Sequence, residues 1–271
     1  MSSSGANPDR PALSQPRLAA DLVEPGSFWR EIRVVDATPS TNTDVLTAAR
    51  SGTPEGLVIV AELQTAGRGR LGRGWVSPPR AGLTFSALLQ PAPAVHVSRW
   101  GWLPLLVGVA LQRAVTATTG VRTRLKWPND LLAGAELYKA AGLLVQAEGG
   151  AVAAGIGLNV TNEPDELPRA DATSLMLTGA TSTDRSRLVV AILRELAADY
   201  LQWRSSGGAV APLHAAYIAV CDTLGREVTA SLPDGRSLTG VAVGVHSTGA
   251  LVLRSGGRDH VISAGDVVHL R

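Results

Sequence analysis

The sequence predicts an α+β protein in which a larger mixed domain is followed by a small β-barrel. Up to about residue 221, short β-branched runs alternate with segments whose apolar residues recur at helical spacing. From residue 222 onward, only short β-rich runs remain, and turn residues separate them. The chain has 271 residues and is 45% hydrophobic, which suffices for one large and one small packed domain.

The N-terminal segment is predicted to lie outside both domains. Residues 1–17 are polar, contain Ser and Pro and have no apolar run for export, so we expect a solvated tail, with at most a short helix over 18–30. We therefore divide the chain into a flexible tail at 1–28, a main domain at 29–221 and a barrel at 222–271. The longest apolar segment, Trp102 to Ala110, is too short to span a bilayer. These features predict a cytoplasmic protein.

The composition excludes several classes of protein. Lys and Arg number 25 and Asp and Glu 23, so the net charge of +2 gives no support to nucleic-acid binding. The single cysteine, Cys221, excludes an internal disulfide and a cysteine-based zinc cluster. The five histidines are scattered without the spacing of metal ligands.

A polar cluster follows the first predicted strand. Residues 32–36 (IRVVD) are typical of a strand, and 44–50 of a short helix that stops at Gly52. Ser40, Thr41 and Asn42 lie between the two. Because one such side chain suffices to cap a helix, three in a row indicate either extra turn chemistry or a set of donors and acceptors for a polar ligand.

The most unusual stretch is the Gly–Arg loop, defined here as residues 64–75 (QTAGRGRLGRGW), which follows a buried strand at 56–62. Its glycines let backbone N–H groups approach a ligand, and its three arginines offer paired donors that match phosphate or carboxylate. With few apolar anchors, the loop is expected to close over its ligand, most simply a phosphate.

Other interpretations of the Gly–Arg loop are weaker. Gly67, Gly69 and Gly72 match the dinucleotide pattern G-x-G-x-x-G, but the prolines at 78–79 prevent the helix that this pattern requires. A Walker-type phosphate loop ends in Gly-Lys-Ser/Thr, which is absent. An arginine-glycine nucleic-acid segment is normally longer and repetitive. A solvated surface hairpin is the plain structural alternative.

Further strands and two long helices are predicted in the rest of the main domain. The strands are expected at 83–89, 121–125, 142–145 and 151–156, and the helices at 100–119 and 185–204. The tryptophans of the first helix are expected in the core. Residues 126–130 (KWPND) form a rigid Trp-Pro corner that displays a cation, an amide and a carboxylate, either as a ligand site or as a structural turn.

The C-terminal segment is predicted to be a small barrel of four or five strands. Its β-rich runs cover 227–232, 238–245, 251–254 and 260–262. The sequences Pro-Asp-Gly, Ser-Thr-Gly and Ser-Gly-Gly separate them and are typical of hairpin turns.

Five motifs, in this order, resemble those of biotin protein ligases. They are Ser40-Thr41-Asn42, the Gly–Arg loop, Lys126-Trp-Pro-Asn-Asp130, Lys139-x-x-Gly142 and Gly155-Ile-Gly-Leu-Asn159. The resemblance extends from about residue 32 to the C-terminus. It implies a catalytic domain of the class II synthetase and biotin ligase type, whose mixed sheet carries ligands on one face and helices on the other, followed by an SH3-like barrel.

The resemblance also implies an activity. Biotin and MgATP are expected to form biotinyl-5′-AMP, from which biotin passes to a lysine of a biotin carboxyl carrier domain of an acyl-CoA carboxylase. The expected small molecules are therefore biotin, ATP and Mg²⁺, with no set of metal-ligating side chains. About 30 residues precede the first strand, too few for the DNA-binding domain of some family members, so we expect a ligase that binds neither DNA nor membranes. A ligand-promoted homodimer is left open.

Roles for individual residues follow from the resemblance. The expected biotin-binding residues are Ser40, Thr41, Asn42, Gln64, Arg68, Gly69, Arg70 and Lys139. The expected nucleotide-binding residues are Arg70, Arg73, Trp75, Asn129 and Asn159. Arg68, Arg70, Lys139 and Asp130 are expected to be catalytic. Fixed cations stabilise the charge that develops when a phosphate is attacked, and the carboxylate would orient the reacting groups.

Two departures from the family pattern bear on these roles. Glu136, Leu137 and Tyr138 precede Lys139 where the family often has Gly-Lys/Arg-Lys, and Gln146 stands where the family has a glutamate. The enzyme alternative is a lipoate or octanoate ligase of the related fold, which the three loop arginines and the C-terminal barrel disfavour. The alternative from another class is a nucleic-acid binder that uses the Gly–Arg loop for phosphate contacts.

Overall fold

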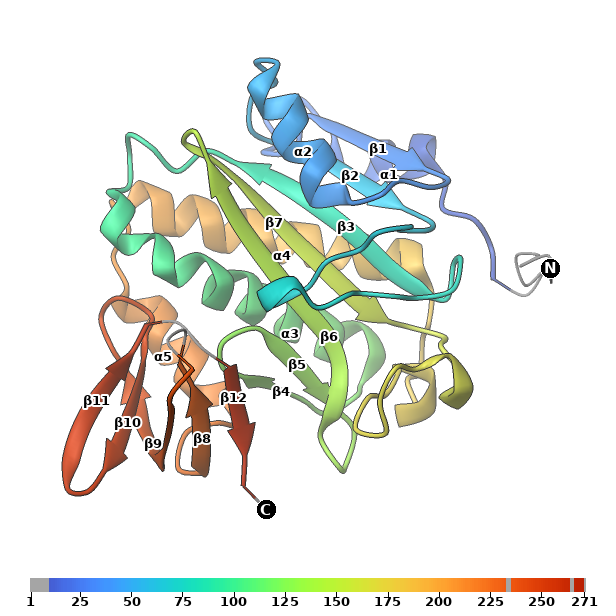
Figure 1. The fold of residues 1–271 in the computed structure, drawn as a ribbon. Coiled ribbons are helices and arrows are strands. Elements are labelled where there is room, and N and C mark those ends of the chain that lie inside the picture. Colours follow the sequence, from blue (N-terminus) through green and yellow to red (C-terminus); the bar gives the residue numbers. More distant parts are fainter. Residues whose placement is uncertain (1–9, 233–234, 264–265, 271) are drawn as a thin grey trace.

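The computed structural model describes residues 10–232, 235–263 and 266–270, which form a seven-stranded sheet followed by a five-stranded sheet (Figure 1). The large sheet contains β1 (Glu31–Val35), β2 (Leu57–Ala61), β3 (Gly82–Leu89), β4 (Thr123–Lys126), β5 (Asp130–Ala133), β6 (Tyr138–Glu148) and β7 (Ala151–Asn159). The small sheet contains β8 (Glu227–Ser231), β9 (Ser237–Val245), β10 (Leu251–Ser255), β11 (Arg258–Ile262) and β12 (Asp266–His269). The helices are α1 (Gln15–Leu22), α2 (Thr41–Arg50), α3 (Leu103–Thr119), α4 (Arg185–Ser205) and α5 (Ala211–Val220).

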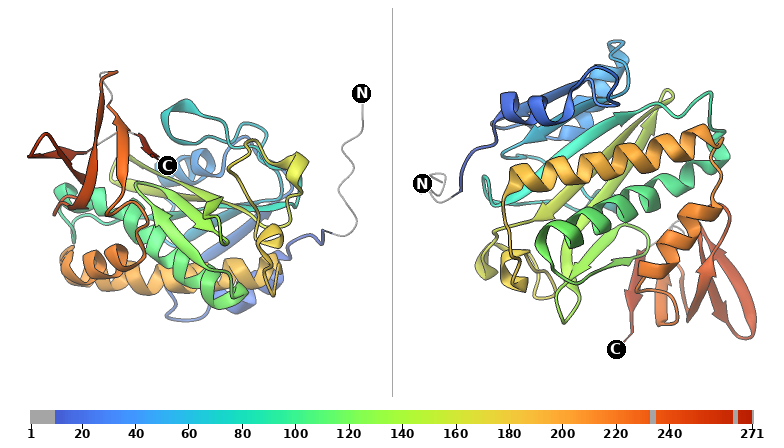
Figure 2. Two further views of the ribbon diagram at one scale, coloured as in Figure 1. Left: turned by 90° about the horizontal axis from the view of Figure 1, so that it is seen from below. Right: turned by 180° about the vertical axis from the view of Figure 1, so that it is seen from behind.

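The large sheet is mixed and has helices mainly on its back. Its strand order is β1-β2-β3-β7-β6-β5-β4, with β1 and β2 parallel and the other neighbours antiparallel. Helices α3 and α4 cross its back side by side, with α1 and α5 beside them (Figure 2, right). Helix α2 packs on the opposite, front face, where Val45 and Leu46 are buried with Ile59 and Leu88. The predicted α+β class is confirmed, with α2 as the exception to helices on one face.

The expected flexible tail at 1–28 is wrong for its described part. Helix α1 lies within it, and Leu13, Leu18 and Leu22 are buried in the main core. Arg10 is also buried and forms an ion pair with Glu166. The composition was polar, but three leucines at positions 13, 18 and 22 suffice to dock the segment on the sheet and α4. Residues 1–9 lie outside the described part of the chain.

Several element boundaries differ from the prediction. Helix α2 begins at Thr41, so Thr41 and Asn42 lie in its first turn and only Ser40 holds the N-cap position, without a side-chain capping bond. Helix α3 begins at Leu103, after a 3₁₀ turn at Val97–Trp102. Strands β5 and β12 were not predicted, because each is only four residues long.

The small antiparallel sheet, in the order β11-β10-β9-β8-β12, docks on the main domain through tryptophans. Trp102 donates from Nε1 to the carbonyl of Ser247 (2.8 Å), and Trp127 donates to that of Gly249 (3.1 Å). Both indoles are buried, which confirms the prediction for Trp102. Because Trp127 belongs to the Trp-Pro corner, the C-terminal sheet is fastened directly to that corner. Within the described ranges, no helix combines the length and apolar character needed to cross a bilayer.

Candidate active site

One cleft of about 1020 Å³ on the front of the large sheet collects all the predicted site residues. The residues it brings together are Ser40, Thr41, Asn42, Gln64, Arg68, Gly69, Arg70, Arg73, Trp75, Asn129, Asp130, Lys139 and Asn159. They come from α2, the Gly–Arg loop, the Trp-Pro corner and strands β6 and β7. The cleft is also lined by residues 168, 169, 171 and 172 and by β12 of the small sheet.

A buried polar network forms the cleft floor beneath α2. Gln64 accepts hydrogen bonds at Oε1 from the backbone N (2.9 Å) and Oγ1 (3.1 Å) of Thr41. The Thr41 hydroxyl lies 2.7 Å from Ser86 Oγ, which donates to Asn42 Oδ1 (2.6 Å). Asn42 Nδ2 in turn donates to Gln146 Oε1 (2.7 Å). The network therefore fixes these side chains before any ligand arrives.

Ser86 is a member that the sequence analysis missed. It lies in the middle of β3 and is fully buried. The signal was a serine among the apolar residues 85–89, whose buried hydroxyl has to find a partner. Gln146, noted as a departure from the family pattern, is the neutral partner of the Asn42 amide, whose second Nδ2 bond goes to the carbonyl of Leu144 (3.0 Å).

The glycines of β6 and β7 make the centre of the floor flat. Gly142 and Gly157 are paired across the two strands, as are Leu144 and Gly155. A β-carbon at Gly155 would overlap Asn42 Oδ1, and one at Gly157 would overlap the Trp75 indole. Alternate residues of a strand share a face, so the Gly-Ile-Gly pattern places bare backbone on the ligand side and apolar side chains on the core side.

The Gly–Arg loop is folded over this floor. Gly69 N donates to the carbonyl of Arg73 (2.6 Å), and Trp75 N donates to that of Gly67 (2.9 Å). Leu71 at the tip has φ 55° and an exposed side chain. At the inner end, the Trp75 indole lies against Gly142 and Gly157, and its buried Nε1 has no hydrogen-bond partner among the described residues. The indole thus packs flat on the glycine backbone of the floor.

Positive charge gathers at the other side of the cleft. Lys139 on β6 forms an ion pair with Asp130, the first residue of β5 (Nζ to Oδ1, 2.7 Å). Burial lowers the pKa of Lys126; the Asp130 carboxylate opposes this, while the neighbouring charges of Lys139 and Arg169 add to it. Lys126, Lys139 and Arg169 lie near two carboxylates, Asp130 and Asp171, and this excess of cations suits a polyanionic ligand.

The side chains of two predicted nucleotide-binding residues form hydrogen bonds with the protein backbone. Asn129 Nδ2 donates to the carbonyl of Leu143 (2.9 Å), and Asn159 Nδ2 donates to that of Thr173 (3.0 Å). Asn129 thereby joins the Trp-Pro corner to β6, and the buried Asn159 joins β7 to the segment after it. Both line the cleft, and their contact with nucleotide stays a prediction.

The chain from residue 222 onward contributes cleft residues that no sequence pattern indicated: two precede β8, and His269 ends β12. Asp222, Arg226 and His269 line the cleft beside the Trp-Pro corner. His269 Nε2 lies 3.1 Å from Thr223 Oγ1, which accepts a hydrogen bond from Trp127 N (2.9 Å). Burial, with the charge of Lys126, lowers the pKa of His269 to about 4, so the imidazole is neutral at pH 7.

No group of three or more His, Cys, Asp or Glu side chains suited to a metal ion occurs among the described residues. Asp130, half-buried among cations, is the carboxylate placed to reach an ion that a phosphate ligand brings with it. Mg²⁺ commonly binds in this way, through one or two carboxylates plus substrate phosphates.

Comparisons with known proteins agree with this geometry. Residues 34–161 match the Biotin/lipoate A/B protein ligase family, and residues 223–270 match the Biotin protein ligase C terminal domain. A biotin–[acetyl-CoA-carboxylase] ligase from Mycobacterium tuberculosis is 44% identical over 97% of both chains. The bifunctional ligase/repressor BirA of Bacillus subtilis is 31% identical over 81% of this chain and 68% of its own.

Solved structures show the same fold. A biotin protein ligase from Aquifex aeolicus in complex with biotin and ATP superposes with a TM-score of 0.75 at 26% identity, covering 90% of this chain and 100% of that one. The Leishmania major biotin protein ligase in complex with biotinyl-5-AMP gives a TM-score of 0.59 at 25% identity, covering 89% and 99%. Because both domain models match and a relative is 44% identical over 97% of both chains, this chain belongs to the biotin protein ligase family.

Proposed function

We propose that this protein is an ATP-dependent biotin–protein ligase that biotinylates a carboxyl carrier domain of an acyl-CoA carboxylase. The observation that carries the proposal is the division of one cleft into a neutral hydrogen-bonding floor and a cationic side. The floor suits a small polar ring on an apolar frame, such as biotin, and the cations suit the phosphates of ATP. The names of the relatives support the same substrates and the carboxylase partner.

The reaction has two steps. A carboxylate oxygen of biotin attacks the α-phosphorus of ATP, the bond to the bridging oxygen of pyrophosphate breaks, and biotinyl-5′-AMP forms. The deprotonated amine of the acceptor lysine then attacks the carbonyl carbon of this mixed anhydride, an amide forms, and AMP leaves. Negative charge develops in the first step, so fixed cations in a partly closed cleft lower its barrier more than they would in water.

Individual roles follow from position. Arg68 and Arg70 flank Gly69 on the loop over the floor and would hold the biotin carboxylate and the α-phosphate. Lys139 would neutralise the phosphate, with Asp130 orienting it. Mg²⁺, when bound with ATP, would neutralise phosphate charge beside Asp130. Ser40, Thr41, Asn42 and Gln64 would shape the biotin site, and Arg73, Trp75, Asn129 and Asn159 the nucleotide site. We place this reaction in the cytoplasm.

The intact mass of a biotin carboxyl carrier domain tests the proposal. After incubation with the protein, biotin and MgATP, we expect an ATP-dependent gain of one biotinyl group. Lipoate replaces biotin in a parallel reaction, and a gain there instead would favour the alternative ligase. Release of pyrophosphate without a mass gain would show that adenylation works and that the acceptor is another protein. Neither product, with folded protein, would overturn the proposal.

A further inference from the structure

The segment between β7 and α4 forms a wall of the cleft. We define the wall loop as residues 161–175. Residues 168, 169, 171 and 172 line the cleft, while 163–165 and 168–171 are exposed. Near its C-terminal end, the wall loop forms hydrogen bonds with both backbone groups of Lys139. Lys139 N donates to the carbonyl of Asp171 (2.9 Å), and Thr173 N donates to that of Lys139 (2.9 Å). The position of the wall loop therefore bears directly on Lys139.

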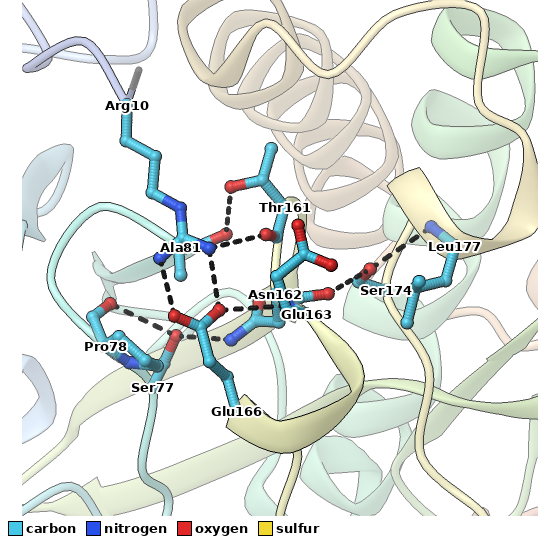
Figure 3. Close-up of polar contacts among 10 residues, drawn as sticks. All are labelled: Arg10, Ser77, Pro78, Ala81, Thr161, Asn162, Glu163, Glu166, Ser174 and Leu177. Atoms are coloured by element: carbon cyan, nitrogen blue, oxygen red, sulfur yellow. Dashed lines mark hydrogen bonds and ion pairs between the residues drawn. The ribbon is translucent and has the colours of Figure 1, made fainter. Parts of the chain in front are cut away.

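Arg10, near the N-terminus, binds the first residues of the wall loop; we call this set of hydrogen bonds the clasp (Figure 3). Arg10 donates from Nη2 to the carbonyl of Thr161 (2.7 Å) and to Glu166 Oε2 (2.7 Å), and from Nη1 to Glu166 Oε1 (3.0 Å). Glu166 Oε2 also accepts from the backbone N of Glu163 (2.9 Å). One guanidinium thus ties the start of the wall loop to its first turn. The hydrogen bonds from Arg10 lower the pKa of Glu166.

The residues that follow Arg10 are anchored by a buried ion pair. Glu62, at the end of β2, and Arg185, the first residue of α4, form a buried ion pair (2.6 Å) in which each side chain is 5% exposed. The same two side chains hold the following arm: Glu62 Oε1 accepts from Leu13 N (2.6 Å), and Arg185 Nη2 donates to the carbonyl of Pro11 (2.6 Å). Since the arm is anchored in the core, the clasp limits motion of the wall loop.

The side of the cleft that the wall loop closes is the cationic one. Arg169 of the wall loop adds to the charge around Lys126 and is itself held by Asp171 (2.6 Å). The neutral floor lies under α2, on the side of β2 and β3. Displacement of the wall loop should therefore affect the binding of a phosphate-bearing substrate more than that of biotin.

We propose that Arg10 is a positioning residue for the nucleotide, holding the wall loop against Lys139 through Glu166 and Thr161. This inference rests on the proposed function, since it names the substrate whose binding the clasp controls. Arg10 does not line the cleft, so it acts only through the wall loop. Charge-assisted bidentate bonds of this kind combine strength with a fixed geometry.

The test compares the wild-type protein with Arg10→Ala, Arg10→Lys and Glu166→Gln. Arg33→Ala is the matched control, because Arg33 forms a bidentate pair of the same kind with Glu31 (2.7 and 3.0 Å) on the edge strand β1, away from the cleft. Biotin-dependent exchange of pyrophosphate into ATP gives KM for each substrate. We expect KM for ATP to rise about tenfold in Arg10→Ala, equivalent to about 1.4 kcal/mol, with KM for biotin unchanged.

Hydrogen exchange of the backbone amides of 163–173, measured without substrates, reports on the clasp itself. We expect faster exchange there in Arg10→Ala and Glu166→Gln, an intermediate rate in Arg10→Lys, and no change in Arg33→Ala. A purely structural arginine would instead lower the melting temperature and the fraction of active enzyme, with both KM values unchanged; that result would overturn the inference.

The experiments distinguish failure of the proposed ligase function from failure of the proposed role of Arg10. Wild-type protein that exchanges no pyrophosphate with biotin present would refute the proposed function, and with it the nucleotide role. Wild-type exchange together with an unchanged KM for ATP in both Arg10→Ala and Glu166→Gln would refute the inference alone. Unchanged amide exchange over 163–173 would show that the wall loop does not depend on Arg10.

Discussion

Removing the Ser86 hydroxyl should impair biotin binding through the floor network. Ser86 is fully buried, donates to Asn42 Oδ1 (2.6 Å) and lies 2.7 Å from Thr41 Oγ1. The substitution Ser86→Ala adds no volume, so its effect comes from the lost hydrogen bonds alone. Asn42 Oδ1 would lose the donor of a buried hydrogen bond, and the first turn of α2 would lose its tie to β3.

The size of the effect follows from these contacts. One lost hydrogen bond and one buried acceptor without a donor together cost about 2 kcal/mol. For a chain of this size, that corresponds to a fall in melting temperature of about 4 to 8 °C. If Thr41 and Asn42 shape the biotin site, KM for biotin should rise about tenfold, equivalent to about 1.4 kcal/mol, with KM for ATP unchanged. Pyrophosphate exchange at varied biotin and varied ATP measures both constants.

Thr119→Ala is the matched control. Thr119 is also fully buried, and its Oγ1 donates to the carbonyl of Val115 (2.7 Å) in α3, behind the sheet. It should cost comparable stability without changing either KM. If Ser86→Ala lowers the melting temperature as Thr119→Ala does but leaves KM for biotin unchanged, the floor network serves only folding, and the reasoning that links it to biotin is refuted.

Three further predictions concern single positions. Gly155→Ala should abolish biotin-dependent pyrophosphate exchange, because its β-carbon would overlap Asn42 Oδ1; wild-type KM for biotin would contradict this. Thr223→Val should destabilise the protein by about 1 to 2 kcal/mol in thermal unfolding, because Trp127 N loses its acceptor, whereas unchanged stability would mean that another acceptor replaces it. His269 has its pKa lowered to about 4, so the unfolded chain binds the extra proton first, and stability should fall as the pH drops from about 6.5 toward 4. His269→Gln should flatten this part of the curve of unfolding free energy against pH, and an equally steep curve would exclude His269 as the cause.

Local patterns were sufficient to predict most elements. The β-branched runs of β2 and β3 and the helical spacing of α3 and α4 lie within the predicted ranges to within a few residues. Hydrophobic periodicity is local information, which is why it predicts elements but not their neighbours. Nothing in the sequence order indicated that β3 pairs with β7, 62 or more residues further on, and so places Ser86 opposite Gly155.

For the candidate site too, some features were predictable from local sequence and others were not. Motifs with unusual backbone or charge, such as the Gly–Arg loop and the Trp-Pro corner, were visible because each concentrates special residues in a short stretch, and the structure places all of them in one cleft. Their individual roles stay predictions. The role of Asn42 within the floor network was not foreseeable, since its partners lie 44 and 104 residues away.

What the sequence by itself determined is therefore most of the elements, the α+β class and the family with its chemistry, since these depend on composition, period and short motifs. The tertiary structure alone decided which residues support the site. Arg10 stood in an apparent tail yet holds Glu166, 156 residues away, and His269 came from another sheet to border the cleft. Such contacts depend on packing between distant segments, where a single arginine or histidine carries no local pattern that marks its partner.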